Sequence, residues 1–260
     1  MVLYGSISFI AGLIFGSFAN VCIARLPRGG SIVTPRSYCP KCNTPVKWFD
    51  NLPLISYVLL KAKCRACNEK ISIQYPLVEF FTGVAFLALA LHFEGSILLP
   101  VYLVFTLALI IITGIDYFHQ IIPDSLSLGI LVMGLCFCPF NQALGAGLKV
   151  RLINSLGGVI AGGGGLFLVG FIGEKIMRRE AMGGGDVKLL AGIGAVLGWA
   201  KVFSVLFTAS LIGSAFGLAL IFSKKIERTG YIPFGPFLAF AAYLNLFLPN
   251  IMGFLNILAK

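Results

Sequence analysis

The sequence predicts an all-α polytopic membrane protein with about eight transmembrane helices. Of the 260 residues, 58% are hydrophobic and only 12% are charged, whereas soluble domains carry about 25% charged residues. The apolar residues form long runs, and the basic residues lie between these runs. The net charge of +10 does not indicate a nucleic-acid partner, because the sequence contains no RNA- or DNA-binding motif.

Eight apolar runs are the expected spans, although several are shorter than the ~20 residues that a spanning helix needs. They are Leu3–Ala24, Pro76–Phe93, Ile97–Ile115, Ser125–Phe140, Leu152–Ile172, Leu189–Trp199, Val202–Phe222 and Phe234–Leu258. The first run lacks the basic segment of a cleavable signal peptide, so we expect a retained span. We therefore expect a first span at 1–24, a loop domain at 25–75 and a membrane core at 76–260.

Basic residues are distributed unequally between the two sides of the membrane. The loops on one side (25–75, 116–124, 173–188 and 223–233) hold sixteen Lys and Arg residues, and the opposite side holds four. Cytoplasmic loops carry the excess of positive charge in membrane proteins. The sequence therefore places the 25–75 loop in the cytoplasm and both termini outside.

Two C-x2-C pairs lie in the 25–75 loop. Their residues are Cys39, Cys42, Cys64 and Cys67. Four thiolates presented by two such turns form a closed, tetrahedral, structural zinc site. Disulfides or redox dithiols are the alternative, and the reducing cytoplasm disfavours disulfides. The other three cysteines lie in spans, where we expect small buried hydrophobes.

Two aspartates stand at span edges on the predicted cytoplasmic face. Asp116 ends the third run, and Asp186 follows Gly183-Gly-Gly185 before the sixth run. An ionisable residue in a membrane span is a candidate functional group. Peptide hydrolysis by two aspartates needs one ionised carboxyl to activate water and one protonated carboxyl to donate to the scissile carbonyl. Two carboxyls that share one site do not both ionise readily, so such a pair supplies both forms.

Other polar residues near these aspartates have simpler interpretations. Asp124 follows a proline and precedes Ser125, so we expect it to cap the next helix. Lys188 is expected to anchor its span at the lipid headgroups. The glycines before Asp186 are expected to let the backbone turn sharply and a substrate strand approach closely. An ion path in a transporter remains the alternative for the two aspartates.

These motifs together resemble the type IV prepilin peptidase family, also called leader peptidase/N-methyltransferase. The family's opening pattern is similar to the segment 16–27, and the paired C-x2-C follows. The segments 115–124 and 182–190 resemble the two catalytic segments, and Ile232-Pro-Phe-Gly-Pro-Phe237 resembles a C-terminal motif. The resemblance covers nearly the whole chain.

The resemblance implies an aspartic endopeptidase of the bacterial inner membrane that cuts leaders from prepilins and pseudopilins on the cytoplasmic side, after a glycine. Asp116 and Asp186 would be catalytic, and the four cysteines of the loop would bind zinc. Most members also methylate the new N-terminal residue, usually phenylalanine, with S-adenosylmethionine. A G-x-G-D peptidase without methyl transfer is the alternative.

Two positions depart from the family pattern in the loop associated with methylation. Ala62 stands where a glycine is common, and Asp50 stands where a glutamate is usual. The sequence contains no glycine-rich nucleotide fingerprint, so it indicates no residues for S-adenosylmethionine. The identity of the processed prepilins and the oligomeric state are left open.

Overall fold

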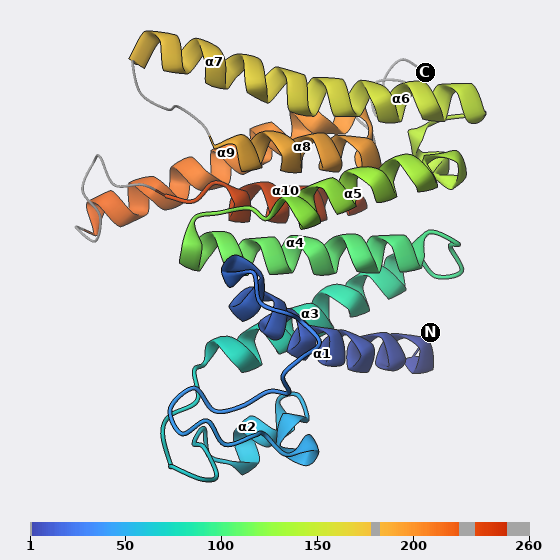
Figure 1. The fold of residues 1–260 in the computed structure, drawn as a ribbon. Coiled ribbons are helices and arrows are strands. Elements are labelled where there is room, and N and C mark those ends of the chain that lie inside the picture. The colour runs from blue at the N-terminus through green and yellow to red at the C-terminus, as the bar shows by residue number, and fades with distance from the viewer. Residues whose placement is uncertain (1, 178–182, 224–231, 249–260) are drawn as a thin grey trace. The chain divides into compact units, whose positions relative to one another are not determined.

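The computed structural model describes residues 2–177, 183–223 and 232–248, and this part is helical with no strand (Figure 1). The chain forms two compact units, Met1–Ile111 and Ile112–Lys260. We call them the N-terminal unit and the C-terminal unit. The all-α class predicted from the sequence is confirmed.

The N-terminal unit is built on two helices in close contact. α1 (Val2–Arg25) packs along α3 (Gln74–His92). Glycines permit the approach, because a Cβ on Gly12 would lie 2.7 Å from Gly83 Cα and one on Gly16 would lie 2.7 Å from Glu79 Cα. The segment between the helices contains the short α2 (Ile55–Leu59) and 3-10 turns at Leu26–Arg28 and Trp48–Asn51.

The C-terminal unit surrounds a buried helix, α8 (Gly184–Leu197), in which every residue from Leu189 to Leu197 is buried. α4 (Leu99–His119) begins in the N-terminal unit and ends in the C-terminal unit. The remaining helices are α5 (Asp124–Phe137), α6 (Leu148–Val159), α7 (Gly165–Met177), α9 (Trp199–Phe222) and α10 (Gly235–Phe247). α8 packs mainly on α5 and α6 and also contacts α9 and α10 (Figure 1).

Close backbone contact with α6 and hydrogen bonds from polar side chains hold α8 in place. A Cβ on Gly158 of α6 would overlap the Gly194 carbonyl oxygen, so the two backbones touch at this point. Ser155 Oγ donates to the Ala195 carbonyl oxygen at 2.7 Å, and Asn141 Nδ2 donates to the Val196 carbonyl oxygen at 3.0 Å. Small residues allow such close helix contacts in membrane proteins.

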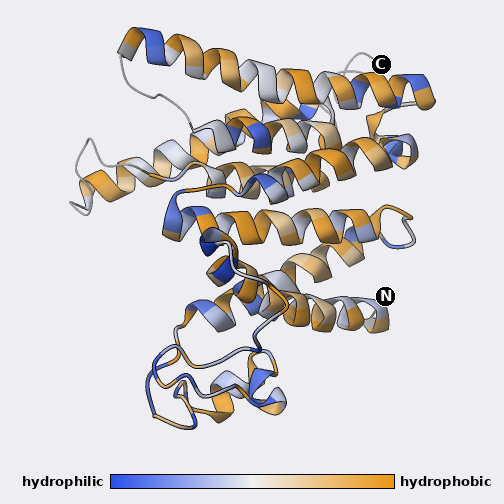
Figure 2. Cartoon of the chain, viewed as in Figure 1, coloured by the Kyte–Doolittle hydropathy of each residue, from blue (hydrophilic) through white to orange (hydrophobic). Residues whose placement is uncertain are grey.

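Hydrophobic residues run along most of the length of the helices (Figure 2). Many large apolar side chains are exposed, while others are buried. On α9, Phe203, Phe207 and Leu211 recur every four residues and are 60%, 71% and 59% exposed. Residues four apart share one helix face. An outward apolar face of this kind suits contact with lipid.

Among the described residues, five helical segments are long and apolar enough to cross a membrane. They are Leu3–Arg28, Gln74–His92, Leu99–His119, Leu148–Ile176 and Trp199–Phe222. Two further apolar helices, Asp124–Phe140 and Gly235–Phe247, are shorter. The predicted sixth span corresponds to α8, which has 14 residues and begins before Asp186. The count of eight spans is therefore not confirmed.

Parts of the sequence-based assignment lie outside the described residues. The last predicted span extends to Leu258, and residues 249–260 are not described. The same holds for 178–182 and 224–231, which contain five of the basic residues used for the predicted orientation. The predicted fifth span is one continuous segment in which a π-helical turn, Ile160–Gly164, joins α6 to α7.

The contact between Gly158 and Gly194 predicts a specific sensitivity. Gly158→Ala should lower the free energy of unfolding by roughly 1–3 kcal/mol, because the added methyl group forces the α6 and α8 backbones apart. Thermal unfolding of the purified protein in detergent measures this effect. Gly165→Ala is the matched control, because a Cβ there meets nothing within 4 Å. Equal melting temperatures for the two variants would contradict the proposed packing.

Candidate active site and metal site

Asp116 lies in the last turn of α4 and is 4% exposed. The backbone N–H of Gly235, the first residue of α10, donates to Asp116 Oδ2 at 3.0 Å. A Cβ at position 235 would lie 2.6 Å from the same oxygen. Only glycine therefore lets the backbone come this close to the carboxyl group. The motif around Gly235 is visible in the sequence, but its role is not, because the contact joins residues 119 positions apart.

Asp186 lies in the first turn of α8 and is 6% exposed. Its backbone N–H donates to the Gly183 carbonyl oxygen at 3.1 Å. Its Oδ1 atom is buried and has no hydrogen-bond partner within the described part of the chain. A buried carboxyl oxygen without a partner is unusual in folded proteins and calls for an explanation.

Of the glycines before Asp186, Gly185 has the closest packing contact. A Cβ on Gly185 would lie 2.9 Å from Ile122 Cβ, so this glycine permits close contact with the segment after α4. Gly183 has an extended backbone (φ −70°, ψ 136°), and none of the glycines at 183–185 has a positive φ. The predicted sharp turn stays a prediction, because residues 178–182 are not described.

The two aspartates belong to the same unit, and their carboxyl groups interact electrostatically. Ile122 lies beside a neighbour of each aspartate. It contacts Gly185, next to Asp186, and its side chain lies 3.2 Å from a Cβ built on Gly235, whose N–H binds Asp116. The starts of α8 and α10 and the end of α4 therefore converge. Two buried carboxyls that interact do not both ionise readily. The arrangement can hold one neutral and one ionised carboxyl, which is what acid–base catalysis needs.

Asp124 does not cap a helix, so this expectation is wrong. It is the first residue of α5, the N-cap position is Pro123, and no side chain caps the helix. Both Asp124 carboxylate oxygens instead accept from Lys188 Nζ, at 2.7 and 2.8 Å. The pair is solvent-exposed, with side chains 45% and 60% accessible for Lys188 and Asp124. It links α5 to α8 at the surface and contributes little to stability.

The four cysteines of the loop come together within the N-terminal unit. Their sulfur atoms lie within 4.8 Å of one another, with 3.9 Å between Cys39 and Cys67 and 4.0 Å between Cys42 and Cys64. Two thiolates on one tetrahedral zinc ion, each at ~2.3 Å, are about 3.8 Å apart. The cluster therefore has the donor atoms and spacing for one metal ion.

The two C-x2-C turns share one backbone design that the sequence analysis missed. In each, the residue after the second cysteine is an asparagine with positive φ, 55° at Asn43 and 57° at Asn68. Each asparagine N–H donates to the carbonyl oxygen of the first cysteine in its turn, at 2.9 and 3.0 Å. Asparagine tolerates this left-handed conformation better than most residues. The repeated C-x2-C-N pattern was the available signal.

Local hydrogen bonds favour the metal-binding thiolate form at two of the four cysteines, Cys42 and Cys64. The hydrogen bond with the Thr44 side chain, followed by that with its backbone, lowers the pKa of Cys42 to about 6. Hydrogen bonds from the backbone of Cys67 and then Ala66 lower the pKa of Cys64. A thiolate, rather than a thiol, is the metal ligand.

The loop positions that depart from the family pattern have clear local environments. Asp50 accepts from Arg65 Nε at 2.9 Å and from Arg65 NH2 at 2.6 Å, and these bonds hold the pKa of Asp50 below its usual value. Ala62 has a φ of 58°, in the left-handed region. Glycine adopts this conformation without the steric cost that a Cβ brings. The structure thus explains why glycine suits position 62.

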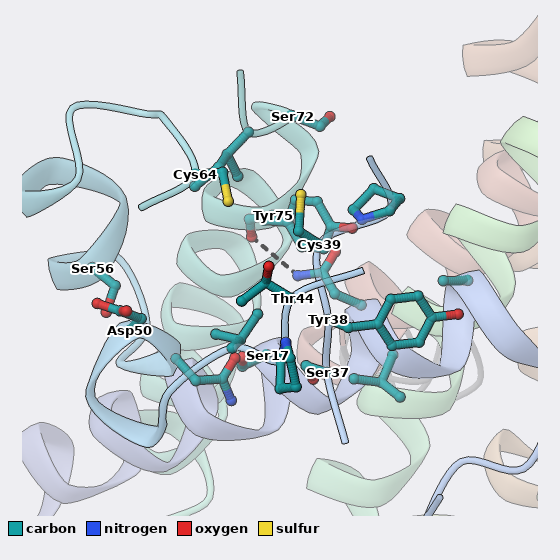
Figure 3. Close-up of a pocket in the computed structure, with 18 of the residues that line it drawn as sticks. Ser17, Ser37, Tyr38, Cys39, Thr44, Asp50, Ser56, Cys64, Ser72 and Tyr75 are labelled. Carbon is teal, nitrogen blue, oxygen red and sulfur yellow. Dashed lines mark hydrogen bonds between the residues drawn. The ribbon is translucent and has the colours of Figure 1, made fainter. Parts of the chain in front are cut away.

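A cavity of about 860 Å³ lies in the N-terminal unit, between the loop and the adjoining ends of α1 and α3 (Figure 3). Residues from all three segments line it, including Asn20 of α1, Tyr38 of the loop and Glu79 of α3. The sequence pattern did not predict a small-molecule site here. The walls of the cavity come from residues 17–79, which lie far apart along the chain and meet only in the fold.

Comparisons with known protein families divide the chain into two parts that correspond roughly to the N-terminal and C-terminal units. Residues 10–93 match the Bacterial Peptidase A24 N-terminal domain, and residues 103–218 match the Type IV leader peptidase family. The cysteine cluster and the cavity fall in the first match, and both aspartates fall in the second. Gly235 lies outside both.

Several curated proteins are similar along most of the chain. A protein of Aeromonas salmonicida (strain A449) is 35% identical over 94% of this chain and 90% of its own length. One of Neisseria gonorrhoeae is 33% identical over 90% and 87%, and one of Klebsiella pneumoniae is 38% identical over 80% and 91%. All three are called prepilin leader peptidase/N-methyltransferase. No solved structure matches the chain.

Proposed function

The chain belongs to the type IV leader peptidase family, and on this premise we propose that it removes the leaders of type IV prepilins and pseudopilins with Asp116 and Asp186 as the catalytic pair. The observation that carries this assignment is the burial of two interacting carboxyl groups in one helical unit, inside the segment that matches the peptidase family. An ion-coupled transporter is disfavoured by the family membership.

In this mechanism the ionised carboxyl takes a proton from water, and the water attacks the carbonyl carbon of the scissile peptide bond. The neutral carboxyl donates to the carbonyl oxygen and then helps to protonate the leaving amine. The hydrogen bond from the Gly235 N–H to Asp116 fixes that carboxyl, whereas Asp186 Oδ1 has no partner among the described residues. Asp186 Oδ1 is thus available to bind water or the scissile carbonyl.

A structural zinc ion at Cys39, Cys42, Cys64 and Cys67 is the second part of the proposal. Four thiolates complete the tetrahedral shell and leave no position for substrate, so the metal has no step in the reaction. Sulfur–sulfur distances of 3.9 and 4.0 Å support this assignment. The ion would hold together a loop that has only short helices and two isolated β-bridges within its described structure.

A second activity, methylation of the new N-terminal amine with S-adenosylmethionine, follows from the names of the relatives. The names favour this bifunctional enzyme over a peptidase that lacks methyl transfer. S-adenosylmethionine supplies an electrophilic methyl group on a sulfonium, and the protein must supply a binding site and a neutral amine.

The proposed location is the bacterial inner membrane, with the active site and the 25–75 loop on the cytoplasmic side and both termini outside. Five long apolar helices in the described part of the chain, together with exposed apolar residues, support a lipid environment. The excess of basic residues in the proposed cytoplasmic loops supports the orientation. The division into a first span at 1–24, a loop domain at 25–75 and a membrane core at 76–260 stays part of this proposal.

Asn substitution tests the catalytic pair. Asp116→Asn and Asp186→Asn should each lower the rate of leader cleavage by roughly 10²–10⁴-fold, because each removes an acid–base group. The measurement is cleavage of a purified prepilin in detergent, followed by gel mobility and mass spectrometry. Asp124→Asn is the matched control and should cleave at the wild-type rate. Loss of cleavage in Asp124→Asn, with retention in Asp116→Asn, would overturn the assignment.

Gly235→Ala tests the contact that orients Asp116. The new Cβ would lie 2.6 Å from Asp116 Oδ2, so the carboxyl group or α10 must move. A misplacement of about 1 Å in a catalytic group costs roughly 10²-fold in rate. We expect kcat for cleavage to fall by about that factor in the same assay. Gly129→Ala, where a Cβ meets nothing within 4 Å, should leave kcat unchanged.

Metal analysis tests the zinc site. The protein purified under reducing conditions should contain one zinc ion per chain by elemental mass spectrometry, and Cys64→Ser should lose most of it, because a structural site needs all four ligands. Cys136→Ser changes an exposed cysteine of the C-terminal unit and should retain the ion. A full complement of zinc in Cys64→Ser would refute the site.

A further inference from the structure

The cavity of the N-terminal unit has the size and lining of a small-molecule site. Its volume of about 860 Å³ lies within the ~300–1,000 Å³ typical of ligand pockets. Its walls include the aromatic residues Tyr38 and Tyr75, hydroxyl groups such as Ser17 and Thr44, and two of the clustered cysteines, Cys39 and Cys64 (Figure 3). Six basic residues also line it: Arg25, Arg28, Lys41, Lys47, Arg65 and Lys70. Aromatic faces attract ligand cations, and a sulfonium is a cation.

Asn20 presents an unpartnered acceptor at this cavity. Its side chain is 3% exposed, and its amide nitrogen donates to the carbonyl oxygens of Gly16, at 3.3 Å, and Tyr75, at 3.1 Å. These two bonds fix the orientation of the amide. The Oδ1 atom is buried and has no hydrogen-bond partner among the described residues. It is therefore suited to accept a hydrogen bond from a ligand hydroxyl or amino group.

Glu79 is a buried carboxylate in the wall of the same cavity, 8% exposed. Its Oε2 accepts from the Leu54 backbone N–H at 2.8 Å, and the Ser17 side chain also forms a hydrogen bond to it. No salt bridge to Glu79 is present in the described structure. Leu54 has a φ of 58°, so Glu79 also helps to hold a strained turn of the loop. A carboxylate without a cationic partner can serve a cationic ligand.

The cavity lies in a different unit from the aspartate pair. It belongs to Met1–Ile111 and to the segment that matches the N-terminal family model, whereas the aspartates lie in the segment that matches the peptidase model. Methyl transfer needs a binding site for the methyl donor, which peptide hydrolysis does not use. The N-terminal unit contains a cavity and a buried carboxylate that peptide hydrolysis does not use.

We propose that this cavity is the methyl-transfer site, in which Asn20 binds S-adenosylmethionine and Glu79 accepts the proton of the substrate's N-terminal ammonium. The assignment rests on the proposed methyltransferase function and deepens it by naming residues. Tyr38 and Tyr75 provide aromatic surface for the sulfonium, and the cavity volume accommodates the donor.

The proposed step balances in protons and charge. An α-amino group has a pKa near ~8, so it is mostly an ammonium at neutral pH and has no lone pair to attack. Glu79 takes one proton, and the neutral amine then attacks the methyl carbon. The N–C bond forms as the S–C bond breaks, and the electron pair of that bond returns to sulfur. The products are a secondary ammonium and a neutral thioether, S-adenosylhomocysteine.

The test separates donor binding, proton transfer and folding. The full-length protein in detergent is titrated calorimetrically with S-adenosylhomocysteine, and methyl transfer is measured on a peptide with a free N-terminal phenylalanine, which needs no cleavage. Leader cleavage and zinc content report folding. The variants are Asn20→Leu and Glu79→Gln, and Glu94→Gln is the matched control, an exposed carboxylate that does not line the cavity.

Each variant has a distinct expected result. Asn20→Leu should bind S-adenosylhomocysteine about tenfold or more weakly, because it removes the acceptor. Glu79→Gln should bind it within about threefold, since the amide oxygen can still accept from Leu54, but should methylate at least about 100-fold more slowly at neutral pH. The methylation rate of Glu79→Gln should rise about tenfold for each unit of increasing pH up to ~8, because the fraction of free amine rises. The wild-type methylation rate should stay nearly constant near neutral pH. Cleavage should be unchanged in all variants.

The outcomes distinguish failure of the proposed methyltransferase function from failure of the site assignment. A wild-type protein that neither binds S-adenosylhomocysteine nor methylates the peptide would refute the methyltransferase function itself. A wild-type protein that methylates, with Asn20→Leu and Glu79→Gln behaving in the same way, would overturn the site assignment alone. A Glu79→Gln variant that loses binding, zinc or cleavage, with an unchanged pH profile, would show that Glu79 only supports the loop.

Discussion

The burial of two carboxyl groups in one helical unit is the constraint on which the rest of this structure depends. Isolated charges in an apolar interior are costly, so buried carboxyls need partners or a shared proton. Asp116 accepts from the Gly235 N–H, and repulsion between the Asp116 and Asp186 charges favours a pair with only one ionised carboxyl. This arrangement requires helix ends to meet closely, which explains the glycines at 185 and 235.

The two units provide two different chemical environments. In the C-terminal unit the carboxyls belong to a helix bundle whose outer surface is apolar, a setting suited to acid–base chemistry on a peptide bond. In the N-terminal unit, the loop around four thiols borders a cavity whose wall includes one buried carboxylate, Glu79. Hydrolysis needs a pair of carboxyls that share protons, whereas methyl transfer needs one carboxylate that removes a proton from an amine. The placement of the acidic residues matches this difference.

The sequence predicted what depends on composition and local pattern. The all-α class, most of the helices and the approach of the four cysteines follow from apolar runs and from C-x2-C spacing, and the structure agrees with them. It did not predict the contact of Gly235 with Asp116, the Asp124–Lys188 pair or the cavity at Asn20 and Glu79. These features join residues 55 or more positions apart, so tertiary packing alone decides them. The count of eight spans is not confirmed, because a short apolar run such as that of α8 can also be a buried core helix.

Proximity of the two carboxyls proposed to be catalytic can be measured directly by cysteine cross-linking. In the double variant Asp116→Cys/Asp186→Cys, a short bifunctional thiol reagent should join the two positions within one chain, and peptide mass spectrometry would identify the linked fragments. The pair Asp124→Cys/Asp186→Cys serves as the comparison and should link less efficiently. Efficient linkage of 116 to 186 is the expected result. Failure of this linkage, while both thiols react singly with the same reagent, would contradict a shared site and with it the proposed mechanism.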